Sequence, residues 1–141
     1  MPRIYNRMAH EATTEYVWIV EDDVIPPLDA AERLMRGFDE GVASVSGAYR
    51  SRFHSGYVAW DSQGKPIENA GVGVTSVGGN GFGCVILRRS VLQQTVLQHV
   101  RPTPDYDPNF YHWLADTPWQ ARVEWRVTCD HLERLQEVFC G

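Results

Sequence analysis

Long hydrophobic runs are missing from this sequence, and with them any sign of a membrane anchor. No apolar stretch approaches the roughly 18 residues that a transmembrane helix needs. The opening segment, MPRIYNRMAHEATTEY, lacks the apolar core of a signal peptide. We therefore expect no transmembrane segment and a cytoplasmic location.

Basic residues, cysteines and several catalytic motifs are also scarce. The 13 lysines and arginines are outnumbered by 18 aspartates and glutamates, which gives a formal net charge of −5 and argues against a nucleic-acid partner. The three cysteines have no CxxC spacing, so we expect Cys84 and Cys129 to be small, reduced core residues rather than zinc ligands. HExxH, GxGxxG, a P-loop and a serine nucleophile elbow are all absent.

The patterns that are present predict one α/β domain over residues 1–141. Strand patterns occupy residues 16–20, 42–49, 84–88 and 123–128, a hairpin pattern lies around Ser62-Gln63-Gly64, and helix patterns occupy 4–14, 29–38, 91–99 and 108–115. Their order predicts a mixed β-sheet flanked by helices. The strand YVWIV shows no alternation, which predicts burial on both faces.

Local signals predict where several helices begin and end. Asp29 and Glu32 have capping-box spacing, and Gly41 is placed to close that helix. Ser90 and Gln93 predict the start of the next helix. Asp107-Pro108 predicts another, with proline at its first position, and a short polar helix is expected at the end of the chain.

Three acids stand at the end of the YVWIV strand. In an extended chain Glu21 and Asp23 would share a face, with Asp22 on the opposite one. Carboxylates this close raise one another's pKa unless a cation intervenes, and oxygen ligands suit Mg²⁺ or Mn²⁺. A solvated turn that caps the next helix is the structural alternative. His131 follows another strand and is either a further metal ligand or an ordinary histidine.

Other candidates also carry two interpretations. Asp107 is either a helix cap or a general base in a cleft. The segment GGNGFG, with Gly79, Asn80 and Gly81, either lets the backbone approach a ligand closely or forms a flexible turn. Trp113 is either a sugar-stacking side chain or a core residue.

These pieces together resemble the second half of a GT-A-fold glycosyltransferase of the family-2 type. RIYNRMAHEATTEYVWIVEDDVIPP is similar to the helix and strand that lead into that family's acidic DxD motif, here Glu21-Asp22-Asp23. GNGFGCVILRRSVL resembles its acceptor-side strand, DPNFYHWL its helix start after the catalytic acids, and VEWRVTCDH its closing strand. The resemblance covers residues 3–131, with four motifs in the correct order.

The resemblance implies a metal-dependent, inverting transfer of a sugar from a nucleotide-sugar to an acceptor hydroxyl. Asp23, assisted by Glu21 and His131, would hold Mn²⁺ or Mg²⁺, and the ion would hold the donor's diphosphate. Asp107 would be the base, with Asp105 as the alternative, although the acid usual just before the base is Tyr106 here. The residues that would contact the donor or the acceptor are Asp22, Gly79, Asn80, Gly81 and Trp113.

The resemblance leaves the family's first strand–helix units, which grip the nucleobase and ribose, without a counterpart in this sequence. The YVWIV strand would then have an exposed edge or face, so we expect a homo-oligomer that covers it. Two alternatives to an enzyme stay open. One is a non-catalytic module that binds metal or sugar nucleotide, and the other is an inert remnant of a glycosyltransferase.

Overall fold

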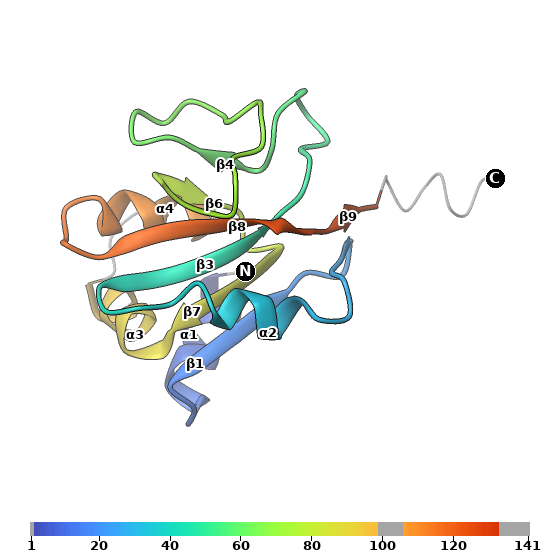
Figure 1. Cartoon of the computed structure of the whole chain (residues 1–141). Coiled ribbons are helices and arrows are strands. Elements are labelled where there is room, and N and C mark those ends of the chain that lie inside the picture. The colour runs from blue at the N-terminus through green and yellow to red at the C-terminus, as the bar shows by residue number, and fades with distance from the viewer. Residues whose placement is uncertain (1, 99–105, 133–141) are drawn as a thin grey trace.

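The computed structural model describes residues 2–98 and 106–132 (Figure 1). Its helices are α1 (Pro2–Glu11), α2 (Ala30–Met35), α3 (Arg89–Gln98) and α4 (Tyr106–Leu114). Its strands are β1 (Tyr16–Val20), β2 (Val24–Ile25), β3 (Val42–Ala48), β4 (Ala59–Trp60), β5 (Val74–Val77), β6 (Gly79–Asn80), β7 (Cys84–Arg88), β8 (Gln120–Thr128) and β9 (Asp130–His131). Five of them form a sheet in the order β1-β7-β3-β8-β5.

The main sheet is mixed, as the sequence predicts. Strand β7 is antiparallel to both of its neighbours, β1 and β3. Strand β8 runs parallel to β3 and antiparallel to β5. Strands β1, β3 and β8 therefore point in one direction, and β7 and β5 point in the other. The short strands form two separate pairs, β2 with β9 and β4 with β6.

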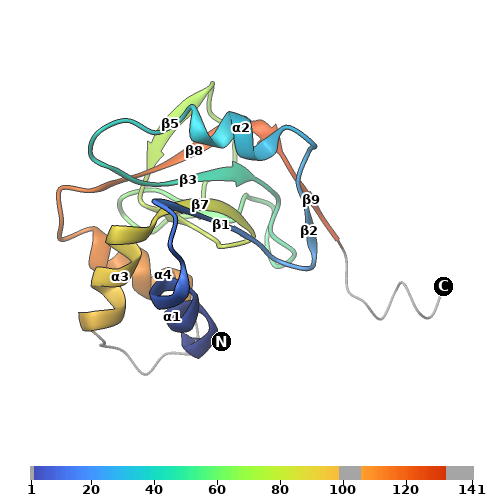
Figure 2. The same cartoon turned by 90° about the horizontal axis from the view of Figure 1, so that it is seen from below.

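Helices cover both faces of the sheet, which confirms the α/β fold class. Helices α1, α3 and α4 lie together on one face, and α2 lies on the other (Figure 2). The two larger hydrophobic clusters follow the same division, since one contains residues of α1, α3 and α4 and the other contains residues of α2. The sheet is thus the middle layer between two cores.

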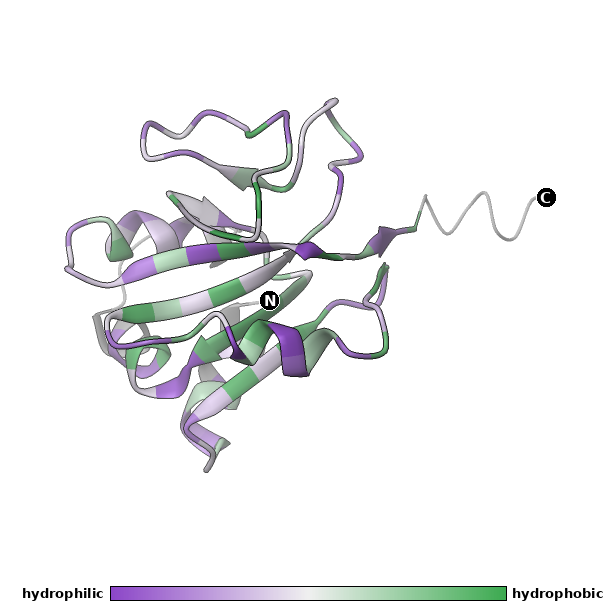
Figure 3. Cartoon of the chain, in the orientation of Figure 1, coloured by the Kyte–Doolittle hydropathy of each residue, from purple (hydrophilic) through white to green (hydrophobic). Residues whose placement is uncertain are grey.

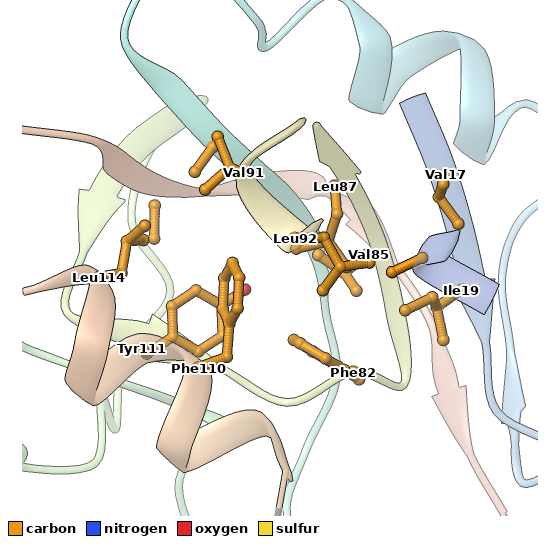
Figure 4. Packing of buried hydrophobic residues seen from close by; sticks show 13 residues of the cluster. Val17, Ile19, Phe82, Val85, Leu87, Val91, Leu92, Phe110, Tyr111 and Leu114 are labelled. Carbon is orange, nitrogen blue, oxygen red and sulfur yellow. The ribbon is translucent and has the colours of Figure 1, made fainter. Parts of the chain in front are cut away.

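The larger core lies between the sheet and the three helices. Phe82 joins the end of β6 to helix α4, because its ring meets those of Phe110 and Tyr111 edge-on at centroid distances of 5.7 and 6.0 Å (Figure 4). The hydroxyl of Tyr111 is hydrogen-bonded to Ser44 Oγ on β3 at 3.0 Å. These aromatic contacts fix helix α4 relative to the middle of the sheet.

The second core lies beneath α2 and contains Leu34, Val45, Ile86 and Val127. Strand β8 contributes Val127 to it, and the alternating hydropathy of this strand is visible as purple and green bands (Figure 3). Glu124 on β8 is buried and is held by the Nε and Nη2 atoms of Arg126 at 3.0 and 2.8 Å. Those hydrogen bonds hold the pKa of Glu124 below its usual range.

The burial of strand β1 differs from the prediction. The prediction that YVWIV is buried on both faces is wrong, because Val17 and Ile19 are buried while Trp18 is 43% and Val20 40% exposed. Among the described residues β1 pairs only with β7, so it is an edge strand. The short helix α2 leaves the Trp18 side of β1 partly open.

The helix signals gave the positions of the helices but not their exact ends. Asp29 is the N-cap of α2, yet its side chain makes no capping hydrogen bond and instead pairs with Arg33 Nε at 2.7 Å. The helix ends at Met35, and Gly41 lies in the turn before β3 with φ of +85°. The predicted capping box and the closing role of Gly41 are therefore wrong.

Helices α3 and α4 start earlier than predicted. Helix α3 begins at Arg89, so Ser90 lies inside it, and α4 begins at Tyr106, so Pro108 is its third residue. The closing polar helix predicted after residue 131 lies outside the described residues. None of the described helices is both long and apolar enough to cross a membrane.

The glycine-rich stretch over residues 71–83 contains two strands, β5 and β6, where the sequence suggested a turn or a ligand loop. The expected turn at Ser62-Gln63-Gly64 is present, since Gly64 N donates to the carbonyl of Asp61 at 3.0 Å and Gly64 has φ of +84°. The expected hairpin is formed, because Asp61 N donates to the Lys65 carbonyl at 2.9 Å and Tyr57 N donates to the Ile67 carbonyl at 2.8 Å across that turn. Strand β4, in its first arm, also pairs with β6.

Candidate functional site

Three chain segments with polar side chains meet at one end of the sheet. Strands β1, β3 and β8 point in the same direction, so their carboxyl ends lie at the same edge. The acidic turn follows β1, the segment with Arg50 and Arg52 follows β3, and His131 follows β8. Open α/β sheets bind ligands at the carboxyl ends of their strands, so this edge is the candidate site.

The acidic segment is a turn and not an extended continuation of β1. Glu21 N donates to the carbonyl of Gly83 at 2.9 Å, and the carbonyl of Glu21 accepts a hydrogen bond from Val24 N at 3.1 Å. The expected alternation of Glu21 and Asp23 on one face therefore fails. Asp22 is exposed, and Asp23 is turned toward β9.

Asp23 is the centre of the site. Its Oδ2 atom lies 3.2 Å from His131 Nε2 and 2.8 Å from Arg52 Nη2. The side chains of Asp23, Arg52 and His131 are 24%, 33% and 12% exposed, so the cluster is shielded but reachable. The two predicted residues Asp23 and His131, separated by 108 positions, are thus neighbours in space.

The ring of His131 is held in a defined orientation by its surroundings. Strand β9 pairs with β2, and Leu132 N donates to the Asp23 carbonyl at 2.8 Å, which ties the two segments together. The Nδ1 atom of His131 lies 2.6 Å from the carbonyl oxygen of Arg50, and the ring packs edge-on against Tyr49 at 5.2 Å. Such a carbonyl partner fixes ring and tautomer together.

The donor atoms fit a divalent cation, although only two of the three predicted ligands come together. The 3.2 Å between Asp23 Oδ2 and His131 Nε2 is close to the roughly 3 Å between adjacent ligands of an octahedral ion with bonds of about 2.1 Å. Over residues 2–98 and 106–132, no three histidine, cysteine or acidic side chains are grouped for a metal. Glu21 is therefore not part of a three-ligand set with them.

A crystal structure provides the comparison with known proteins. The fold is similar to that of A197 from STIV. The two chains superimpose with a TM-score of 0.70 at 18% sequence identity, over 94% of this chain and 65% of A197. The chain thus spans about two thirds of the length of A197, and at this identity the likeness concerns the fold alone. No family model and no curated protein matches the sequence.

The glycine-rich segment packs against protein and not against an open space. A side chain at Gly79 would collide with Trp60, and one at Gly81 would collide with the hydroxyl of Tyr49. Asn80 between them is fully buried, and its Nδ2 donates to the Gly81 carbonyl at 2.8 Å. These glycines let β6 approach the aromatic side chains closely, and their predicted ligand contacts stay predictions.

The acceptor-side candidates lie on or near α4. Trp113 is half-buried, packs against the larger core and contacts Phe110 at a centroid distance of 6.2 Å. Asp107 is the second residue of α4, whereas its alternative Asp105 lies outside the described residues. The backbone position of Asp107 is set by α4, which packs on β6.

Two thiols lie beside the site and share a hydrogen bond. Cys84 opens β7, and Cys129 comes two residues before His131; both are buried and unpaired, as predicted for small core residues. The Cys129 thiol lowers the pKa of Cys84 to about 7, and the interaction raises the pKa of Cys129. Gly47 lies beside them, since a Cβ atom at that position would be 3.0 Å from Cys129 Sγ.

Sequence reasoning missed Arg50 and Arg52, although both shape the site. The signal that could have found them is their place directly after the buried strand β3, the same place that the acids have after β1. That signal becomes useful only when β1 and β3 are known to run in the same direction.

Proposed function

We propose that this chain is a GT-A-type, glycosyltransferase-like protein that holds a divalent cation and the diphosphate of a nucleotide-sugar beside Asp23 and His131. One observation carries the proposal: these two side chains lie 3.2 Å apart, at the edge of the sheet where α/β proteins bind ligands. The motifs that resemble family-2 glycosyltransferases include both residues and add independent support.

The orientation of His131 supports a cation at this place. In the neutral imidazole, Nδ1–H donates to the carbonyl of Arg50, and Nε2 then presents a lone pair to Asp23. Two acceptors 3.2 Å apart repel unless a proton or a cation lies near both. Mn²⁺ and Mg²⁺ accept such donors and complete their shells with water and phosphate oxygens.

The proposed reaction is an inverting transfer to a hydroxyl acceptor. Asp107 accepts the proton of the acceptor hydroxyl, whose oxygen bonds to the anomeric carbon as the bond from that carbon to the diphosphate breaks. The nucleoside diphosphate leaves with the electron pair of the broken bond. The bound cation would supply charge neutralisation for this leaving group.

A second candidate, a binding module without turnover, is favoured by the Arg52–Asp23 ion pair. The guanidinium already neutralises the carboxylate at 2.8 Å, so the site is balanced in charge before any ion arrives. Such a site would bind a nucleotide-sugar without a requirement for transfer. We place either function in the cytoplasm, in keeping with the two unpaired thiols Cys84 and Cys129.

We further propose that a second copy of the chain covers the open edge of β1. Trp18 and Val20 are exposed on that strand, and Ile25 and Leu28 are exposed in the segment that follows it. An unpaired edge strand with apolar side chains is a surface on which another chain can pair. A197 has chain beyond the matched part, and here a second copy would supply additional structure beside the site.

Thermal unfolding tests the proposed ligands. With Mn²⁺ and one nucleoside diphosphate from a panel of UDP, GDP, ADP and CDP, at about a hundred times the dissociation constant, the native state gains about 2.7 kcal/mol. For a domain of this size that gain raises the melting temperature by roughly 10 °C. Asp23→Asn should abolish the shift, because it removes the charge that holds the ion.

Asp116→Asn is the matched control, since Asp116 is an exposed aspartate just after α4. It should leave the shift unchanged. A shift with Mn²⁺ alone would keep the metal site and remove the nucleotide from the proposal. Equal shifts in the chain and in Asp23→Asn would place the ligand elsewhere and refute the proposed site.

The oligomer is tested by light scattering behind a size-exclusion column. The unmodified chain should elute as a dimer or larger, and Trp18→Lys should shift it to the monomer, because a lysine on an edge strand opposes strand pairing. Phe53→Lys is the control, as Phe53 is 86% exposed on the loop after β3. A monomer for the unmodified chain at micromolar concentration would contradict the proposed dimer.

A further inference from the structure

We propose that Arg52 is a counter-cation for Asp23. Its guanidinium pairs with the Asp23 carboxylate when the site holds no metal. A divalent ion displaces the guanidinium, which then contacts the diphosphate. This inference rests on the proposed function and adds a residue that the sequence patterns did not indicate. It begins from a single atom, since Asp23 Oδ2 is shared by Arg52 Nη2 at 2.8 Å and His131 Nε2 at 3.2 Å.

The shared oxygen makes the metal and the guanidinium competitors. An ion bound by Asp23 Oδ2 and His131 Nε2 would stand beside the same oxygen that Arg52 now contacts. Two cations within a few ångströms repel, and the repulsion is stronger in a partly shielded site than in water. Metal binding therefore requires the guanidinium to leave Asp23.

The loop that carries Arg52 is held in place independently of Asp23. Ser51 N donates to the Gly56 carbonyl at 2.9 Å, and Phe53 N donates to Ser51 Oγ at 3.0 Å. Arg50 Nη1 donates to the carbonyl of Ser55 at 2.8 Å. The displaced Arg52 side chain would thus stay at the site, because its backbone position is fixed on both sides.

The diphosphate offers the displaced guanidinium a new partner. A planar guanidinium donates two parallel hydrogen bonds to phosphate oxygens, which makes arginine well suited to this anion. The side chain is 33% exposed, so it is not committed to a buried structural network. Arg52 would then oppose binding of the metal alone and favour binding of metal and diphosphate together.

The test is a comparison of Arg52→Gln with the unmodified chain in two titrations. In the first, loss of the electron paramagnetic resonance signal of free Mn²⁺ measures metal binding without nucleotide. Arg52→Gln should bind Mn²⁺ roughly three- to tenfold more tightly, because the variant no longer has to break an ion pair. In the second, calorimetry measures UDP and GDP binding at saturating Mn²⁺.

In that second titration the effect of the substitution on affinity should have the opposite sign. Arg52→Gln should bind the preferred diphosphate roughly tenfold more weakly, because a charge-assisted hydrogen bond to phosphate is lost. Arg52→Lys, which keeps the charge without the planar fork, should restore the Mn²⁺ affinity of the unmodified chain and part of the diphosphate affinity. Arg33→Gln is the matched control, since Arg33 on α2 pairs with the N-cap residue Asp29 and not with Asp23.

The outcomes separate this inference from the function on which it rests. If Arg52→Gln weakens the binding of both Mn²⁺ and the diphosphate, or of neither, Arg52 does not compete with the metal and the inference is refuted. The proposed function stands in that case, provided that Asp23→Asn still abolishes Mn²⁺ binding. If the unmodified, folded chain and the Arg52 variants all fail to bind Mn²⁺, the proposed metal-dependent function is refuted and the inference with it.

Discussion

Replacement of Phe82 with alanine should lower the free energy of unfolding by about 3–5 kcal/mol, the cost typical of removing a buried aromatic ring. Phe82 is 1% exposed and stands between the end of β6 and the helices. Its ring contacts those of three other residues, Tyr5 at 5.4 Å, Phe110 at 5.7 Å and Tyr111 at 6.0 Å. The cavity left by alanine would loosen α1, through Tyr5, and α4 together. Figure 4 shows Phe82 beside Phe110 and Tyr111 of α4.

Urea denaturation measures this change, and Phe53→Ala provides the matched control. Phe53 is 86% exposed, so the same substitution there should change stability by no more than about 0.5 kcal/mol. Both variants should retain the slope of the unmodified chain, since the surface exposed on unfolding is nearly the same. A loss below about 1.5 kcal/mol for Phe82→Ala would mean that the core refills the cavity.

The strands were predictable from sequence because apolar and β-branched residues recur in short runs. Residues 16–20 and 84–88 are strands with the predicted limits. The pattern could not show how many neighbours each run has, since a short apolar run fits an edge strand as well as a central one. β7 lies between two strands and is buried, whereas β1 lies at the edge and exposes Trp18.

The packing of the glycine-rich segment could not be predicted from sequence because glycine has two opposite uses. It permits unusual backbone conformations, and it also allows a strand to approach a large side chain. Gly71 lies against Trp125 and Gly79 lies against Trp60, so both serve close packing. Each of these glycines is separated in sequence from the tryptophan that it contacts. A local sequence pattern therefore cannot show that the contact exists.

The candidate site was predictable only in part. Asp23 and His131 were selected through the resemblance, since no spacing rule links residues 108 positions apart. Their proximity follows from the common direction of β1 and β8, which is a property of the whole sheet. The turn that separates Glu21 from them depends on a hydrogen bond to Gly83, which sequence periodicity does not encode.

Replacement of Asp107 with asparagine should slow glycosyl transfer by about 10²–10⁴-fold and leave Mn²⁺ binding unchanged, because the amide cannot accept the proton of the acceptor hydroxyl. The place of Asp107 in the fold supports its selection. Asp107 lies in the first turn of α4, the helix whose Phe110, Tyr111 and Leu114 are buried in the larger core.

The measurement is release of nucleoside diphosphate from the nucleotide-sugar whose diphosphate raises the melting temperature, with and without a panel of hydroxyl acceptors. Asp116→Asn, at the other end of α4, should transfer at the rate of the unmodified chain. If Asp105→Asn stops transfer and Asp107→Asn does not, the base is Asp105 and not Asp107. If Asp107→Asn also loses Mn²⁺ binding, its effect on transfer is structural. A folded chain that binds the donor but transfers nothing to any acceptor would favour the binding module, because the proposed metal site lies at the ends of β1, β3 and β8, whereas the proposed transfer also uses Asp107 on α4.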